Sequence, residues 1–137
     1  MSVRVLTVDD QARFRSLARQ VIRATPGFEP AGEAASGADG IALAAELRPD
    51  LVLMDVRMPG LDGIDAARRI AHAHSARLLV LLSSDVVIVP PDLAATAIRK
   101  EQLCPTMLRR LWDSAPQGED DSTAARRAPP SSTIASP

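Results

Sequence analysis

Hydrophobic residues along this chain fall into two alternating kinds of segment. Three short apolar runs, residues 3–8, 51–55 and 77–83, have the length of buried strands, and residues 28–34 form a weaker candidate. Between them, apolar residues recur every three or four positions, which is the spacing of an amphipathic helix. The first such stripe consists of Phe14, Leu17, Ala18, Val21 and Ile22. Strands and helices are therefore predicted to alternate from the N-terminus onward.

Typical helix-start and helix-stop residues delimit the predicted helices. Pro26 and Gly27 follow the first stripe and end its helix. Ser36 suits the N-cap of a second helix, which Pro49 ends. A third helix is predicted over residues 63–73.

The alternation breaks down after Ser83. The following residues form a β-branched run and then Pro90 and Pro91, a combination that disfavours a helix. A short strand over residues 95–99 is predicted instead, and a last helix begins near Pro105. The apolar side of that helix consists of Leu108, Leu111 and Trp112.

This order of elements indicates an α/β fold, in which a parallel sheet carries helices on both faces. The carboxyl ends of parallel strands meet at one edge of such a sheet, where ligands bind. A chain of 137 residues suits one domain, which we place at residues 1–113. Residues 114–137 are rich in Pro, Ser and charge and are predicted to form a disordered tail.

Composition and charge exclude several classes of protein. The net charge is -1 and the basic residues are scattered, which argues against binding nucleic acid through its phosphates. Cys104 is the single cysteine, so no intramolecular disulfide forms, and we expect a buried or half-buried thiol. The sequence contains no apolar stretch typical of a signal peptide or a membrane span. We therefore expect a soluble, cytoplasmic protein that does not associate with a membrane.

Charged and hydroxyl-bearing residues close the predicted strands. They are Asp9 and Asp10 at the end of the first strand, Asp55 at the end of the third, Ser83 and Ser84 at the end of the fourth, and Lys100 at the end of the fifth. Three carboxylates in one pocket raise one another's pKa values unless a cation neutralises them. Mg²⁺ prefers oxygen ligands, so two carboxylates, a backbone carbonyl from the loop after Asp55 and water suit it.

Such a metal site leaves one carboxylate for in-line attack on a phosphoryl group. Asp55 suits the attack, while the Lys100 ammonium and the Ser83 hydroxyl suit contacts with phosphoryl oxygens. Ser84 competes with Ser83 for the hydroxyl role. Lys100 is the one lysine among 16 basic residues, which is consistent with a position that requires a compact ammonium group.

Together these motifs resemble the receiver domain of two-component response regulators. The resemblance rests on "VLTVDD", "LVLMDVRMPGLDG", "LVLLSSD" and "AIRK", and it covers residues 3–113. It implies a flavodoxin-like, doubly wound, five-stranded parallel sheet of strand order 2-1-3-4-5. It also implies phosphorylation of Asp55 by a sensor histidine kinase, a phosphotransfer protein or a small phosphodonor. By the same resemblance, Asp10 binds Mg²⁺ directly alongside Asp55, Asp9 assists through water, and the backbone carbonyl of Arg57 is a further ligand.

Two features depart from the receiver pattern. Lys100 follows Ser83 by 17 positions, about one helical turn and a loop fewer than usual, so the fourth helix is predicted to be truncated or missing. Ala97 stands at a switch position where many relatives carry an aromatic ring that couples phosphorylation to the output surface. An alternative function is therefore an atypical receiver that acts as a phosphorylation-independent interaction module. The apolar segment "VVIVPP" is expected either to pack over the sheet edge or to contact a partner or a second copy.

The remaining function classes fit the sequence poorly. Phosphatases of the haloacid dehalogenase type carry a second Asp two positions after the nucleophile, where this chain has Arg57. We therefore expect no enzymatic activity beyond self-phosphorylation and autodephosphorylation. No helix-turn-helix pattern follows residue 114, so no DNA-binding domain is expected. The expected partners are a sensor histidine kinase or phosphotransfer protein, an unidentified downstream protein and, as a further option, a second copy in a homodimer.

Overall fold

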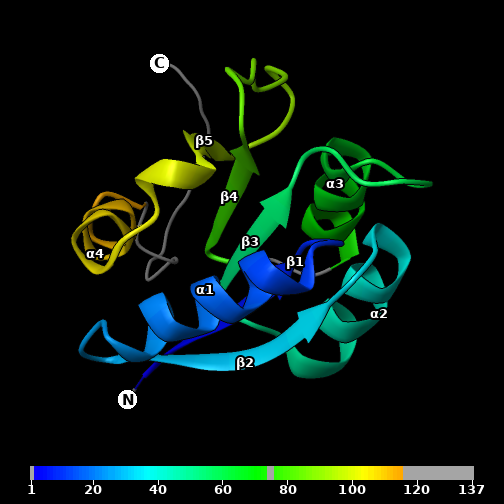
Figure 1. The fold of residues 1–137 in the computed structure, drawn as a ribbon. Helices are drawn as coiled ribbons and strands as arrows, with labels where there is room; N and C mark the ends of the chain where they lie inside the picture. Colours follow the sequence, from blue (N-terminus) through cyan, green and yellow to red (C-terminus); the bar gives the residue numbers. More distant parts are fainter. Residues whose placement is uncertain (1, 74–75, 116–137) are drawn as a thin grey trace, which may run out of the picture.

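The sheet at the centre of the structure has five parallel strands in the order β2-β1-β3-β4-β5. The computed structural model describes residues 2–73 and 76–115. The strands are β1 (Val3–Val8), β2 (Phe28–Ala34), β3 (Leu51–Asp55), β4 (Leu78–Ser83) and β5 (Thr96–Arg99). The helices are α1 (Ala12–Arg23), α2 (Gly37–Leu47), α3 (Gly63–Ala73) and α4 (Pro105–Asp113), and a short 3-10 turn spans Lys100–Gln102. The predicted flavodoxin-like fold is confirmed (Figure 1).

Helices cover both faces of the sheet, and this explains why the central strands are apolar throughout. In β3, Leu51 and Leu53 join the core cluster beneath α1 and α4, while Val52 and Met54 join the cluster beneath α2 and α3. Figure 1 shows these two pairs of helices on opposite faces of the sheet. Because successive side chains of a strand point to opposite faces, a strand buried on both sides has no polar face.

The first helix departs in one respect from the predicted buried stripe. Phe14, Ala18, Val21 and Ile22 are buried as predicted, but the side chain of Leu17 is 46% exposed. Leu17 lies at the edge of the buried stripe, where a helical side chain can face solvent. The prediction that Leu17 is part of the core was therefore wrong.

The connection between β4 and β5 contains no helix in residues 84–95, all of which the structure describes. This confirms the prediction that the fourth helix of the receiver pattern is truncated or missing. Residues 85–90 have no regular secondary structure, and we call them the extended segment because their side chains alternate in exposure as in a strand. A single turn follows, in which the backbone N–H of Leu93 donates to the carbonyl of Pro90 (3.0 Å). A bidentate ion pair between Arg68 of α3 and Asp92 (2.9 Å) ties this connection to the body of the molecule.

Alternate residues of the extended segment face opposite ways. Val87 and Val89 pack against the core cluster beneath α2 and α3. Val86 and Ile88 are 83% and 86% exposed. The segment therefore packs over the sheet with one side, as one of the two expected arrangements requires, and presents its other side to solvent.

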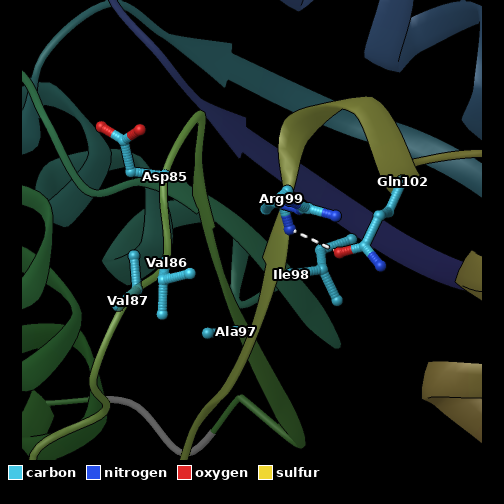
Figure 2. A pocket seen from close by; sticks show the side chains of 7 residues that line it. All are labelled: Asp85, Val86, Val87, Ala97, Ile98, Arg99 and Gln102. Carbon is cyan, nitrogen blue, oxygen red and sulfur yellow. Dashed lines mark hydrogen bonds between the residues drawn. The ribbon is translucent and has the colours of Figure 1, made fainter.

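The missing helix leaves a cavity of about 220 Å³ between the extended segment and β5. Figure 2 shows it, and its lining residues are Asp85, Val86, Val87, Ala97, Ile98, Arg99 and Gln102. At its upper end the backbone N–H of Arg99 donates to Oε1 of Gln102 (2.8 Å). This hydrogen bond satisfies one donor on the outer edge of β5, which is an edge strand.

The last helix begins at Pro105 as predicted, with Leu108 fully buried in the core. Cys104 precedes it as the N-cap residue and is exposed, so the expectation of a buried or half-buried thiol was wrong. An N-cap side chain lies outside the helix and need not face the core. Ala115 is buried against the same core, and the predicted tail from residue 116 lies outside the described residues. None of the helices described is both long enough and apolar enough to cross a membrane.

Candidate functional site

Three carboxylates gather at the carboxyl ends of β1 and β3, which are neighbours in the sheet. One oxygen from each of Asp9, Asp10 and Asp55 can be chosen so that all three lie within 4.8 Å of one another. Asp9 is fully buried and Asp55 is 2% exposed, whereas Asp10 is exposed. The predicted acidic cluster therefore forms, with two members inside the protein and one open to solvent.

The carboxylate of Asp9 is held from two sides. Its Oδ1 accepts a hydrogen bond from the backbone N–H of Gln11 (2.8 Å), and its Oδ2 lies 2.7 Å from Nζ of Lys100. Oδ2 has no aligned hydrogen-bond partner among the described residues, although the ion pair with Lys100 is short. The ion pair with Lys100 is the contact of this oxygen, and a lone pair remains available for a further ligand.

The carboxylate of Asp55 is more weakly stabilised than that of Asp9. Its Oδ1 accepts a hydrogen bond from the backbone N–H of Arg57 (3.2 Å), and its Oδ2 lies 3.6 Å from Nζ of Lys100. Burial, followed by the nearby charge of Asp9, raises the pKa of Asp55 from 3.8 to about 6. The Arg57 hydrogen bond and Lys100 offset only part of this rise. Asp55 therefore carries a charge that the protein alone does not fully neutralise.

Two glycines shape the loop that follows Asp55. Gly60 has a φ of 81°, a left-handed conformation that glycine adopts without strain. Gly63 begins α3 against the backbone of β3, and a Cβ built on it would lie 1.9 Å from the carbonyl oxygen of Asp55. Only a residue without a side chain permits this close approach to Asp55. The backbone N–H of Gly63 also donates a hydrogen bond to the carbonyl of Val56 (3.0 Å). The two glycines thus hold the start of α3 directly behind the acceptor candidate.

A hydroxyl and an ammonium group complete the site from β4 and β5. Ser83 is 2% exposed at the end of β4, and its Oγ accepts a hydrogen bond from the backbone N–H of Asp85 (3.1 Å). Ser84 is exposed. Lys100 follows β5, and its side chain is 15% exposed. These side chains and Asp55 share one cavity of about 220 Å³, which is lined by Gln11, Asp55, Arg57, Ser83, Ser84, Asp85 and Lys100.

Two of these lining residues were not among the predicted site residues. Gln11 lies immediately after the acidic pair, and Asp85 lies two positions after Ser83. Asp85 forms an exposed ion pair with Arg57 (3.3 Å between Nη2 and Oδ2) across the cavity. Their closeness in sequence to strand-end residues was the available signal. The missing information was the direction of the chain after β4, because a helix in place of the extended segment would move Asp85.

The donor set suits a hard divalent cation. All candidate side-chain ligands are carboxylates, and oxygen ligands are those that Mg²⁺ prefers. One ammonium group, that of Lys100, faces both buried carboxylates, and the raised pKa of Asp55 indicates negative charge in excess of what Lys100 neutralises. The residues present therefore fit a magnesium site. Ligation by the backbone carbonyl of Arg57 stays a prediction.

Comparison with known proteins connects this geometry to a family. The family described as "Response regulator receiver domain" matches residues 5–91. Protein-glutamate methylesterase/protein-glutamine glutaminase 5 of Myxococcus xanthus is 43% identical over 82 residues, which is 60% of this chain and 24% of the relative. The transcriptional regulatory protein LiaR of Bacillus subtilis is 40% identical over 82 residues, 60% of this chain and 39% of the relative. The chain thus spans well under half the length of these curated relatives.

Solved structures show the same fold. The response regulator domain of Thermotoga maritima CheB superimposes with a TM-score of 0.71 at 25% identity, covering 83% of this chain and 96% of that one. A LuxR-family two-component response regulator from Aurantimonas gives a TM-score of 0.72 at 24% identity, covering 88% and 92%. The family match spans more than half of the chain and includes the acidic residues of β1 and β3. The protein belongs to the response regulator receiver domain family of two-component systems, in which phosphorylation and Mg²⁺ binding are general.

Proposed function

We infer that the protein is a phosphoacceptor module in which Asp55 receives the phosphoryl group. The observation that carries this proposal is the shared cavity, where the poorly neutralised carboxylate of Asp55 faces both Ser83 and Lys100. A buried carboxylate beside an ammonium group has the charge arrangement that phosphoryl transfer requires. The donor is a sensor histidine kinase, a phosphotransfer protein or a small acyl phosphate.

The proposed transfer is an in-line displacement at phosphorus. A carboxylate oxygen of Asp55 forms the new O–P bond while the bond from phosphorus to the donor atom breaks. The electron pair of the broken bond leaves with the donor, as a histidine nitrogen or a carboxylate oxygen. The Lys100 ammonium and the Ser83 hydroxyl donate hydrogen bonds to phosphoryl oxygens, and the Arg57 N–H keeps Asp55 oriented. The product is an acyl phosphate that water later hydrolyses.

Mg²⁺ would be held by Asp10, Asp9 and Asp55 together with the backbone carbonyl of Arg57. When bound, it neutralises negative charge on the phosphoryl oxygens. The chain's own residues supply the remaining requirements, because Lys100 pairs with both buried carboxylates and Gly63 fixes the backbone behind Asp55. Direct ligation by Asp10 is consistent with its exposure, and an indirect role suits the buried Asp9.

Output is proposed to pass through protein contacts made by residues 1–113, without enzymatic activity beyond self-phosphorylation and autodephosphorylation. The methylesterase and transcriptional functions named for the relatives belong to proteins of which this chain covers 24% and 39%. We do not transfer these functions to the chain. A downstream protein or a second copy is the proposed receiver of the signal.

The test is incubation with acetyl phosphate and Mg²⁺, followed by intact-mass measurement. We expect the wild-type protein to gain the mass of one phosphoryl group and Asp55→Asn to gain none. Asp39→Asn is the matched control, because it alters an exposed carboxylate on α2 that belongs to neither the acidic cluster nor the cavity beside Asp55. This variant should be modified like the wild type. No adduct on the folded wild type, or an equal adduct on Asp55→Asn, contradicts the proposal.

The second candidate function is an interaction module that works without phosphorylation. Two observations favour it: Ala97 is a small residue at the switch position, and residues 84–95 contain no helix. Partner binding, measured before and after the same incubation, separates the two functions. A folded wild-type protein that binds a partner equally well before and after phosphorylation would support this second function.

A further inference from the structure

The ring of Phe14 lies directly under the ammonium group of Lys100. Nζ of Lys100 is 4.6 Å from the centroid of the ring, within the range of a cation–π contact. Phe14 belongs to α1, is 7% exposed and packs in the core cluster beneath α1 and α4. The core of the protein therefore reaches the acidic site through this one aromatic side chain.

The ring contributes a third contact to an ammonium group that two carboxylates already hold. Nζ lies 2.7 Å from Oδ2 of Asp9, 3.6 Å from Oδ2 of Asp55 and over the face of Phe14. A lysine side chain is a flexible four-carbon stem, so contacts on several sides are needed to fix its head. The ring offers attraction without a hydrogen-bond acceptor. It therefore stabilises the ammonium without occupying an N–H that a phosphoryl oxygen needs.

All three aromatic residues of the chain carry a cation over their ring, but only one of these cations lies at the acidic site. Arg109 lies over Phe28 at 5.0 Å, and Arg77 lies over Trp112 at 4.3 Å. Phe28 is 7% exposed, as Phe14 is, and packs in the same core cluster. Phe28 therefore provides an internal control of equal burial whose cation has no contact with Asp9 or Asp55 in the structure described.

We propose that Phe14 is a positioning residue for phosphoryl transfer, because its ring fixes Lys100 at the distance from Asp55 at which the ammonium meets the incoming phosphoryl group. This inference rests on the proposed function of Asp55. Loss of the ring leaves Lys100 paired with Asp9, its nearer partner, and free to turn away from Asp55. Preorganised charge contributes to rate only while it is held in place.

The first test measures the geometry without phosphorylation. Lys100 is the only lysine, so selective isotope labelling of lysine produces one set of side-chain NMR signals. Protons held over the face of an aromatic ring are shifted upfield. We expect this shift for the Cε protons of Lys100 in the wild type and in Phe28→Leu, and its loss in Phe14→Leu. A wild-type signal at the position of a solvated lysine overturns the proposal.

The second test measures the role of the ring at constant shape. Replacing Phe14 by mono-, di- and trifluorinated phenylalanine weakens cation binding by the ring stepwise while its size and burial change little. We expect the rate of acyl phosphate formation from acetyl phosphate to fall steadily, by about threefold to tenfold at full fluorination. The same series at Phe28 should leave the rate unchanged. Denaturant unfolding checks that each variant is folded.

The outcomes separate this inference from the function on which it rests. If the wild type forms no adduct, the proposed function and the inference are both wrong. If the wild type forms an adduct and the rate is constant across the Phe14 series, only the inference is wrong. Equal declines in the Phe14 and Phe28 series also contradict a positioning role, since they would reflect a general change in the core.

Discussion

Asp55 is the residue at which the site's electrostatics are least balanced. Its carboxylate is buried beside Asp9, and one lysine serves both carboxylates. With a pKa of about 6, Asp55 is ionised in most molecules near neutral pH. Without a metal, this buried charge lowers the stability of the fold. A site that gains stability when its charge is neutralised is suited to take up a cation or to become esterified.

This imbalance predicts how Asp55→Asn changes stability with pH in metal-free protein. A carboxyl group whose pKa is raised on folding destabilises the fold above the folded pKa, and the penalty disappears below the unfolded pKa. The window runs from pH 3.8 to about pH 6. The free energy of unfolding of Asp55→Asn, taken relative to that of the wild type, should therefore rise by about 2–3 kcal/mol as the pH increases from 4 to 7.

The measurement is denaturant unfolding of both proteins with a chelator present at a series of pH values. Taking the difference between wild type and Asp55→Asn cancels the titration of all other groups that behave alike in the two proteins. A difference that is constant across the window, or that shifts in favour of the wild type as the pH rises from 4 to 7, contradicts the raised pKa of Asp55.

Gly63 carries the second prediction at this scale. Gly63→Ala should destabilise the protein by about 3 kcal/mol or more, because its Cβ would overlap the carbonyl of Asp55 and displace the acceptor loop. Gly60→Ala is the matched control. It meets no atom within 4 Å and should lose only about 1 kcal/mol through its left-handed backbone. Equal losses in denaturant unfolding would show that the close approach of Gly63 is not as described.

The strand-end members of the site were predictable because their positions follow from the strand pattern alone. Asp9, Asp55 and Lys100 each come at or directly after a strand, and parallel strands bring such residues to one edge. Phe14 was predicted only as a core residue. Its contact with Lys100 depends on where α1 lies relative to the residue that follows β5, which a single helix pattern does not contain. Asp85 was missed for the same kind of reason.

At the scale of elements, the connection between β4 and β5 distinguishes this receiver from the expected pattern. The extended segment 85–90 lines one cavity together with β5, and its first residue, Asp85, also lines the cavity that contains Asp55 and Lys100. Contact with the core comes from alternate side chains, as in a strand, although the segment has no strand partner. The segment thus adjoins both cavities, as does the 3-10 turn Lys100–Gln102 on the opposite side.

Substitution of alternate valines tests this packing. Val87→Ser and Val89→Ser should each lower the free energy of unfolding by about 1–2 kcal/mol, since each buries a hydroxyl in place of apolar contacts. Val86→Ser and Ile88→Ser should each change it by less than about 0.5 kcal/mol, because these side chains are exposed. Denaturant unfolding of the four variants provides the measurement. Equal effects on both sides of the segment would contradict the alternating arrangement.

Most elements could be predicted because each has a signal of its own. The apolar runs, the N-cap Ser36 and the missing helix after Ser83 were all confirmed by the structure. Leu17 and Cys104 were wrongly assigned because burial at the edge of a helix, or at its cap, depends on the neighbouring element rather than on local pattern. β5 begins at Thr96, one residue later than predicted, which lies within ordinary differences in strand boundaries.

At the scale of the whole molecule, the sheet separates two differently built halves. The face beneath α1 and α4 holds all three aromatic residues, whereas the face beneath α2 and α3 is aliphatic and includes the inward valines of the extended segment. The acceptor site lies at the carboxyl edge where the two halves meet. Its partly buried lysine is contacted from the aromatic half, and the extended segment beside it packs on the aliphatic half.

The proposed domain boundary predicts the result of truncation. Ser114 caps α4 and Ala115 is buried, so a chain of residues 1–115 keeps the described core contacts. We expect this chain to have the same free energy of unfolding as the full chain within about 0.5 kcal/mol. It should also accept phosphate at the same rate. A large loss of stability in denaturant unfolding would show that residues after 115 belong to the folded domain.

The central claim is that Asp55 itself carries the phosphoryl group, and chemical trapping tests it most directly. Borohydride reduces an aspartyl phosphate to homoserine, and peptide mass spectrometry then locates the altered residue after incubation with acetyl phosphate and Mg²⁺. The structure and the proposed chemistry predict one altered position, Asp55, in the wild type and none in Asp55→Asn. Homoserine at Asp9 or Asp10, or its absence from the wild type, would contradict the assignment of Asp55 as the phosphoacceptor.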